Sequence, residues 1–374
     1  MILHYDQGMN YVQTVPDFIG RRGGYDKFSA IMDVMGGFMG GDFVLPLSAR
    51  HQALRIKRGH YLVWAEQGRA VYGGQVTTRD NQGDMYFIQM DGVVNLWAQQ
   101  QPGHISWGAG RASDAMVALV GSYGPGPLLS TRADYITKPT AYQCAAYTFT
   151  QQKVVDIINH YNNFEGYEWG GDIIGTGLNR RTVFYYHAPD TTTLHYVIDA
   201  RTLAAPLQLK PDTEKYGNRV RVYYDPATGG AGYVDVLGST EARAAGTDWA
   251  PDIDIGNVKG TTEAEAQEIG RQYLAGLKVN GVETEPVNAE IVIGDSTRIR
   301  SVSGVASYSF WLRPGCNVYL AGASAPGNRI GAAGAGTSLH ITSIEWNKSE
   351  RRVKLTANRS DSLPVMLARL ARTA

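Results

Sequence analysis

Three aspartates in the stretch DWAPDIDIG have the most suggestive spacing for chemistry. Asp248, Asp252 and Asp254 place carboxylates at nearby positions, and such carboxylates can ligate calcium or act as the acid and base of a glycosidase. No glutamate completes a calcium loop, and no matching acid is identifiable elsewhere in the sequence. The stretch is therefore expected to be a solvated acidic loop, with cell-wall hydrolysis as the alternative that these residues leave open.

Three further patterns resemble functional motifs only in part. The glycine-rich stretch at 331–338 has no lysine and no following helix, so it predicts a loop rather than a phosphate cradle. His187 and His195 flank one turn and could face each other across a hairpin, where a satisfied pair is more typical than a metal site. Cys144 and Cys316 lie far apart, which favours buried thiols over a disulfide. The sequence thus predicts a protein that is not an enzyme, with no catalytic residue, no cofactor and no metal site.

Composition narrows the class of protein. A length of 374 residues suggests two to four domains, and 43% hydrophobic with 19% charged residues is globular. The formal net charge of zero does not indicate a nucleic-acid-binding surface. The 22 tyrosines and 44 glycines favour sheets with tight turns. Because the start lacks a signal peptide and no window is apolar enough to span a bilayer, we expect a protein made in the cytoplasm.

The pattern of the first hundred residues predicts a β domain. In DMYFIQMDGVVNLW, two strand-like runs are separated by Asp91-Gly92, a good turn dipeptide. The glycine cluster at 35–43 is expected to be a flexible excursion. One set of apolar residues is expected to share a strand face: Leu54, Ile56, Leu62, Trp64 and Val71.

Helices and further strands are expected after residue 100. A short helix over Ser113–Val120 would bury Met116, Val117 and Val120, and Thr150 would cap a second one with Val154, Ile157, Ile158 and Tyr161 on its packing face. Thr262 and Glu265 form a capping box before a third helix. Its packing side contains Ala266, Ile269, Tyr273, Leu274 and Leu277. Two strand-like segments, RTVFYYHAP and LHYVIDA, are expected to be joined by a Pro-Asp-Thr turn, and Val220 and Val222 indicate a strand with one buried face.

The stretch 339–359 reads as a hairpin without any catalytic residue. Its apolar phase slips between Ile341 and Ile344, which predicts a β-bulge. The sequence also contains a short internal repeat: Gly68-x-x-Val71-Tyr72 reappears as Gly315-x-x-Val318-Tyr319. Each copy follows a segment that contains a tryptophan and is expected to be a strand, around Trp64 in the first copy and Trp311 in the second. Each copy also precedes a predicted strand pair near an interior tryptophan, Trp97 or Trp346. The repeat suggests a duplicated barrel.

The order of these parts resembles the tail hub proteins of tailed bacteriophages, also called baseplate hub or minor tail proteins. The likeness is carried in order by AVYGGQV, GYEWGGD, NRVRVYYDP, TTEAEAQEIGRQYLA, WLRPGCNVYLAG and HITSIEWNKSERRVKLT. The resemblance implies a mainly β chain with two tail-tube-like β-barrel domains, a mixed α/β module and a helix-containing insertion. The corresponding boundaries are 1–100 for the first barrel, 101–205 for the mixed module, 206–225 with 285–360 for the second barrel, 226–284 for the insertion and 361–374 for a C-terminal helix.

The resemblance also implies an assembly in the virion at the tail tip. Three chains with two barrels each would form a pseudo-hexameric ring between a hexameric tail tube or distal tail protein and a trimeric fibre or spike, beside the tape measure protein. DNA would pass through the lumen without specific binding. The chain ends soon after its last barrel strand, so the peptidase or lysozyme-like extensions of some relatives are not expected. A carbohydrate-binding or cell-wall-binding tail-tip protein is the alternative.

Overall fold

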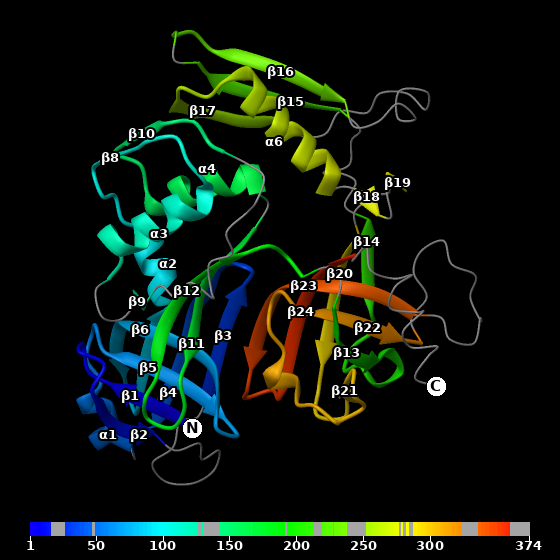
Figure 1. The fold of residues 1–374 in the computed structure, drawn as a ribbon. Helices are drawn as coiled ribbons and strands as arrows, with labels where there is room; N and C mark the ends of the chain where they lie inside the picture. The colour runs from blue at the N-terminus through cyan, green and yellow to red at the C-terminus, as the bar shows by residue number, and fades with distance from the viewer. Residues whose placement is uncertain are drawn as a thin grey trace.

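A computed structural model of the chain describes most of its length. The described residues are 1–15, 27–46, 49–125, 129–130, 143–165, 167–190, 193–211, 219–226, 228–237, 252–276, 278–279, 282–283, 287–322 and 336–359. They form a mainly β protein, as the sequence predicts, whose largest sheet has 17 strands. Figure 1 shows this sheet as two neighbouring units with helices and a smaller sheet stacked at one end.

The first unit is a sheet made from the first ninety residues, in the order β2-β1-β5-β6-β7-β4-β3. The short helix α1 (Arg50–Arg55) lies against β4. The strands are β1 (Ile2–Tyr5), β2 (Tyr11–Val15), β3 (Lys27–Asp33), β4 (Met35–Pro46), β5 (Tyr61–Glu66), β6 (Arg69–Gln82) and β7 (Met85–Asp91).

The second unit is assembled from two distant parts of the sequence, in the order β21-β13-β22-β23-β24-β20-β14. It also contains the 3-10 turns η3 (Ala200–Thr202) and η4 (Ser309–Trp311). Among the described residues, strand pairing closes neither unit into a barrel. The strands are β13 (Leu194–Asp199), β14 (Gln208–Pro211), β20 (Val287–Ile293), β21 (Ile299–Ser301), β22 (Asn317–Ala321), β23 (Gly336–Asn347) and β24 (Arg352–Arg359).

The long strand β23 joins the two units. Its first half pairs with β22, whereas residues Ser343–Asn347 pair with β3 of the first unit. The register of β23 against β24 shifts between Ile341 and Ser343, which confirms the predicted bulge. Because a bulge bends a strand and increases its twist, it can direct β23 from one neighbour to the other. The hairpin at 339–359 therefore forms the seam of the molecule.

One hydrophobic core runs beneath both units. It contains Trp64 and Phe28 from the first unit and Trp346 and Ile344 from the second, all at most 1% exposed. The indoles of Trp64 and Trp346 meet edge to face with their centroids 6.3 Å apart. Burial of such large side chains contributes on the order of 2–3 kcal/mol each. The two units are therefore packed as one body.

A helical layer covers one end of the first unit and has its own core. The amphipathic helix α4 buries Val154, Ile157, Ile158 and Tyr161, as predicted. The elements are α2 (Val93–Ala98), β8 (His104–Trp107), α3 (Ala112–Tyr123), β10 (Tyr147–Thr150) and α4 (Val154–Glu165), followed by the hairpin strands β11 (Glu168–Ile174) and β12 (Arg181–His187) and the short β9 (Leu129–Ser130). In Figure 1 the β11–β12 hairpin runs down from this layer over the first unit.

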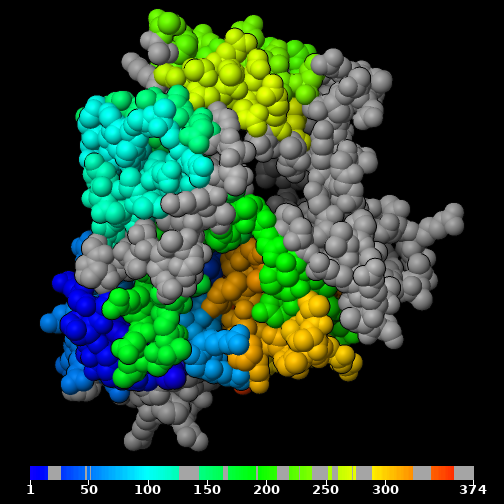
Figure 2. Space-filling view, viewed as in Figure 1, coloured from blue at the N-terminus to red at the C-terminus, as the bar shows by residue number. Residues whose placement is uncertain are grey.

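An outer module caps the helical layer at the far end of the molecule (Figures 1 and 2). It consists of the sheet β15 (Arg219–Asp225), β16 (Gly232–Leu237) and β17 (Ile253–Lys259), in the order β16-β15-β17, and helix α6 (Glu263–Gly276). Two further short strands, β18 (Lys278–Val279) and β19 (Val282–Glu283), pair with each other.

The predicted capping box is confirmed at the start of α6. The backbone N–H of Thr262 donates to Glu265 Oε2 at 2.8 Å, and the Glu265 N–H donates to Thr262 Oγ1 at 3.3 Å. Glu265 Oε1 also accepts hydrogen bonds from the hydroxyl of Tyr147 and the backbone N–H of Ala145. Since these donors belong to the helical layer, the same carboxylate fixes the helix start and ties the outer module to its neighbour.

Several expectations about local structure are wrong. The glycine cluster at 35–43 belongs to strand β4, and its glycines permit close packing: a Cβ at Gly41 would lie 2.9 Å from the Tyr72 ring. The run after Gly92 is helix α2, so Trp97 lies in the helical layer. Leu54 is on the exposed side of α1.

Further corrections concern single residues and one strand. Val117 is 39% exposed on α3, and Thr150 ends strand β10 rather than capping α4. Trp311 lies in η4, not in a strand. Residues 219–225, expected in the second barrel, form β15 in the separate sheet because β15 buries Val220 and Val222 against α6. Most of the loop 331–338, Leu277 and the helix at 361–374 lie outside the described residues.

Among the described helices, none combines the length and apolar character that crossing a bilayer would require.

Candidate functional site

Both sheet units and the β11–β12 hairpin meet at the bulge of β23, and we call this meeting point the junction. The bulged residue Thr342 accepts a hydrogen bond from the backbone N–H of Val34 at 2.9 Å. The carbonyl of Val34 in turn accepts from the N–H of Trp169 at 3.2 Å, where β11 begins. Residues 169–171 of β11 then run parallel to residues 35–37 of β4. The bulge therefore links the second unit, the first unit and the β11–β12 hairpin through backbone atoms.

A polar network lies beside this backbone contact. Glu168 Oε1 lies 2.6 Å from His340 Nε2, and His340 Nδ1 lies 2.8 Å from Asn317 Oδ1. The Asn317 amide also donates to the carbonyl of Thr193 at 2.9 Å and to that of Asp190. Glu168 is 5% exposed and Asn317 is fully buried. Since buried polar groups need partners, these contacts hold β11, β22 and β23 in one arrangement.

The proton positions in this network follow from its geometry. The Nδ2 atom of Asn317 faces two carbonyl oxygens, so it must be the amide nitrogen, and Oδ1 is then an acceptor for His340 Nδ1–H. His340 Nε2 meets a carboxylate oxygen of Glu168 at hydrogen-bond distance, which requires a second proton in that contact. The pair is therefore a charge-assisted contact, imidazolium with carboxylate, or its neutral equivalent with a carboxylic acid.

Gly315 leaves room for this network. Its φ of +82° is a conformation that favours glycine, and a Cβ there would lie 2.8 Å from Glu168 Oε2. The neighbouring backbone is fixed by two hydrogen bonds, Gly315 N–H to the Ile341 carbonyl and Ile341 N–H to the Cys316 carbonyl. The Pro-Gly pair before NVYL therefore has a structural reason at this position.

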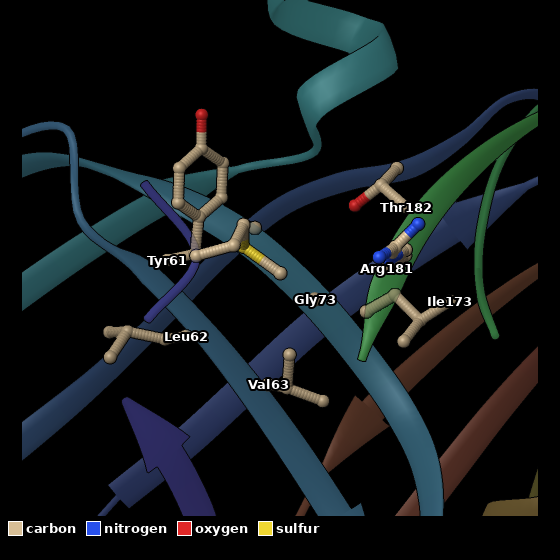
Figure 3. A pocket seen from close by; sticks show the side chains of 9 residues that line it. Tyr61, Leu62, Val63, Gly73, Ile173, Arg181 and Thr182 are labelled. Carbon is tan, nitrogen blue, oxygen red and sulfur yellow. The ribbon is translucent and has the colours of Figure 1, made fainter. Parts of the chain in front are cut away.

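The β11–β12 hairpin also packs directly on the first unit (Figure 3). A Cβ at Gly73 of β6 would lie 1.8 Å from Ile173 Cδ1, so the absence of a side chain there allows the hairpin to approach. A small cavity of about 10 Å³ remains between Tyr61, Ile173 and Thr182. That space is about the size of one water molecule, so it does not indicate a ligand site.

The residues singled out by sequence are not brought together. Asp252 and Asp254 are exposed beside and within β17, and Asp248 lies outside the described residues. His187 is in β12, which pairs with β11, whereas His195 is in β13, which pairs with β21 and β22. The expectation that these two histidines share a hairpin is therefore wrong.

The cysteines agree with the favoured prediction of thiols, since no disulfide joins them. Burial raises the pKa of the Cys316 thiol to about 11, so it stays protonated at neutral pH and is a poor nucleophile. Among the described residues, no three His, Cys, Asp or Glu side chains are grouped as metal ligands would be. The hydrogen bonds at the junction hold strands of both units and the β11–β12 hairpin together.

Sequence reasoning missed the junction network entirely. Glu168 and His340 are 172 positions apart. They lie in the stretches GYEWGGD and HITSIEWNKSERRVKLT, but nothing in either stretch indicates that the two side chains meet. The only local signals were the glycine at 315 and the phase slip at the bulge, which mark the backbone around the network but not its side chains.

Comparison with solved structures identifies the fold. Over 96% of both chains, the molecule superposes on the tail protein from Neisseria meningitidis MC58 with a TM-score of 0.58 at 12% identity. It also matches the 43 kDa tail protein of prophage MuSo2 from Shewanella oneidensis, with a TM-score of 0.53, 14% identity and coverage of 96% of this chain and 99% of that one. The prophage tail protein gp18 from Listeria monocytogenes EGD-e matches with a TM-score of 0.53 at 12% identity, over 99% and 98% of the two chains.

These matches cover nearly the whole chain, so the fold is that of bacteriophage tail proteins, and the resemblance seen in the sequence is confirmed at this level. No model of a protein family matches the sequence, and no curated protein matches it.

Proposed function

We propose that this protein is a structural tail hub of a tailed bacteriophage, located in the virion at the tail tip after synthesis in the host cytoplasm. The observation that carries the proposal is the pair of sheet units joined edge to edge through β3 and β23 over one core. The full-length likeness in fold to phage tail proteins supports it.

The two units would act as two tube-type barrels, completed in the assembly. The first comprises residues 1–91, and the second combines 194–211 with 287–359. The outer module at 219–276 is then an insertion on the outside, together with the helical layer. This division differs from the expected one mainly at β13 and β15, whose strand partners are given by the pairing.

Three such chains would form a pseudo-hexameric ring, because two similar units in each of three copies match a sixfold partner. The ring would join a hexameric tail tube or distal tail protein to a trimeric fibre or spike, beside the tape measure protein, and let DNA pass. Obligate interfaces of this kind bury about 2,000 Å² or more. The role is non-enzymatic and needs no cofactor.

Mass measurement of the purified protein tests the proposal, first alone and then with its tail-tube partner. We expect three copies of the 40.8 kDa chain in the complex, and an image of the particle tip should place them in a ring. A protein that stays monomeric in both conditions would contradict the proposal. Replacing Asp252 and Asp254 with Ala should leave assembly intact, and loss of a hydrolytic activity in that variant would instead favour an enzyme.

A further inference from the structure

The sheet of the outer module has one face that none of the described helices covers. Val220 and Val222 of β15 point toward α6 and are fully buried, so the alternate residues point away from it. On this outward face Tyr223 and Tyr233 are direct cross-strand partners, with ring centroids 6.2 Å apart and planes tilted by 52°. Tyr233 is 60% exposed. Figure 1 shows α6 on the opposite side of the sheet.

Charged side chains hold this aromatic pair in place. Asp235 accepts hydrogen bonds from Arg221 Nε at 2.7 Å and from Arg219 Nη2 at 2.7 Å. The guanidinium of Arg221 also lies over the Tyr233 ring, 4.5 Å from its centroid. Hydrogen bonding to Arg221 and Arg219 lowers the pKa of Asp235 to about 2, so the carboxylate stays ionised at neutral pH. These contacts fix the side chains of the face, and the two arginines with one aspartate leave it a net charge of +1.

A groove continues from this face around the edge of the sheet. It has a volume of about 260 Å³ and is lined by Asp235, Val236 and Leu237 of the edge strand β16 and by Gln267 and Arg271 of α6. Carboxylate, amide and guanidinium groups together offer both donors and acceptors of hydrogen bonds. Three of the five lining residues are polar and none is aromatic, and the volume is just below the ~300 Å³ at which drug-sized pockets begin.

We propose that this face is a carbohydrate-binding site for a neutral oligosaccharide. The C–H edges of a sugar ring carry partial positive charge and can stack on the negative faces of Tyr223 and Tyr233. The sugar hydroxyls would donate to Asp235 and exchange hydrogen bonds with Gln267 and Arg271. Asp235 offsets only one of the two guanidinium charges of Arg219 and Arg221, so an anionic sugar is the competing ligand that the test must include. The inference goes beyond the hub role and does not depend on ring formation.

Saturation-transfer NMR with two neutral probes tests the site. Chitotetraose and cellotetraose, each added to the full chain up to about 10 mM, distinguish an N-acetylated sugar from plain glucose units. We expect at least one probe to bind, and Tyr233→Ala to weaken it about tenfold or more, the equivalent of one lost stacking contact. Tyr233→Phe should retain binding, since stacking needs the ring and not the hydroxyl. Tyr308→Ala, at a 50% exposed tyrosine far from this face, is the matched control.

Several results would overturn the proposal. Absence of binding by both probes would do so, as would equal binding by wild type and Tyr233→Ala. Binding that falls equally in Tyr308→Ala would point to a non-specific effect of exposed tyrosine. Preferential binding of a sulfated polysaccharide, weakened by Arg221→Ala, would identify an anion site instead.

Discussion

The two sheet units contain the same short motif but use its last residue differently. Val71 and Val318 are both fully buried in the shared core, and Gly68 and Gly315 have nearly the same positive φ, +80° and +82°. Tyr72, however, points into the shared core, whereas Tyr319 packs outside it against Leu194.

A β-bulge accounts for this difference. In the first unit Trp64 pairs with Tyr72 and Ala65 pairs with Ala70, so Val71 is an extra residue without a partner in the ladder. Adjacent residues can then both point inward. In the second unit β22 has regular alternation, and Val318 and Leu320 point inward while Tyr319 points outward. One inserted residue in a strand can therefore change the role of a repeated sequence without changing the sequence itself.

The largest expected effect tests whether the units are one body despite this difference. Trp64→Ala and Trp346→Ala should each lower the free energy of unfolding by about 3–5 kcal/mol, because each leaves a large cavity in the shared core. In urea unfolding followed by circular dichroism, both variants should move the same single transition. Leu178→Ala, at a 48% exposed side chain, should change it by less than about 0.5 kcal/mol. Two separable transitions, each shifted by only one of the tryptophan variants, would show that the units fold independently.

A smaller effect tests the bulge itself. Tyr72→Ala should cost about 3–4 kcal/mol, since the Tyr72 ring contacts Phe28 and Phe38 and its hydroxyl donates to the Met39 carbonyl at 2.6 Å. Tyr319→Ala should cost about 1–2 kcal/mol, because it lies in a small satellite cluster. The urea midpoints of the Tyr72→Ala and Tyr319→Ala variants, measured side by side, test whether the two losses differ. Equal losses would mean that the different orientation of the two tyrosines carries no energetic consequence.

Features with a local signal could be predicted from the sequence. The capping box at Thr262 and Glu265 and the slip between Ile341 and Ile344 depend on residues within three positions of each other, and both are confirmed. The buried face of α4 follows from helical periodicity in the same way. The sequence pattern also predicted two related β regions. It did not predict which strands complete the second one.

Features that depend on distant partners could not be predicted. The strand β4 looked like a loop because its glycines have no side chains to show a period, and the reason for those glycines is elsewhere: Gly37 lies where a Cβ would be 2.2 Å from the Gly171 backbone. The Glu168–His340 contact likewise joins residues far apart in the sequence. Packing in three dimensions determines which residues fit at such positions. Their partners therefore cannot be predicted from a single sequence.

A second difference between the units concerns their histidines. In the first unit Gln13 donates to the Gln52 carbonyl and contacts His4 Nδ1 at 3.1 Å, and His4 Nε2 lies 2.7 Å from His60 Nδ1. Since the Gln13 nitrogen is the donor, His4 must accept at Nδ1 and donate from Nε2, so both imidazoles are neutral. In the second unit His340 has a different partner, because its Nε2 lies 2.6 Å from a carboxylate oxygen of Glu168.

Acidification should therefore weaken the first unit at His4. Burial, with a smaller contribution from His60, lowers the pKa of His4 from 6.5 to about 4, although Asp6 nearby acts in the opposite direction and Arg55 in the same one. The folded chain then binds fewer protons than the unfolded chain between these values, so the stabilisation is complete above about pH 6.5 and is lost as the pH falls toward 4. Melting temperatures at pH 7 and pH 5 should differ more for wild type than for His4→Gln, which cannot titrate. His104→Gln, at an exposed histidine, should keep the wild-type difference. If His4→Gln keeps it as well, the acid sensitivity resides in other groups and the neutral pair does not distinguish the two units.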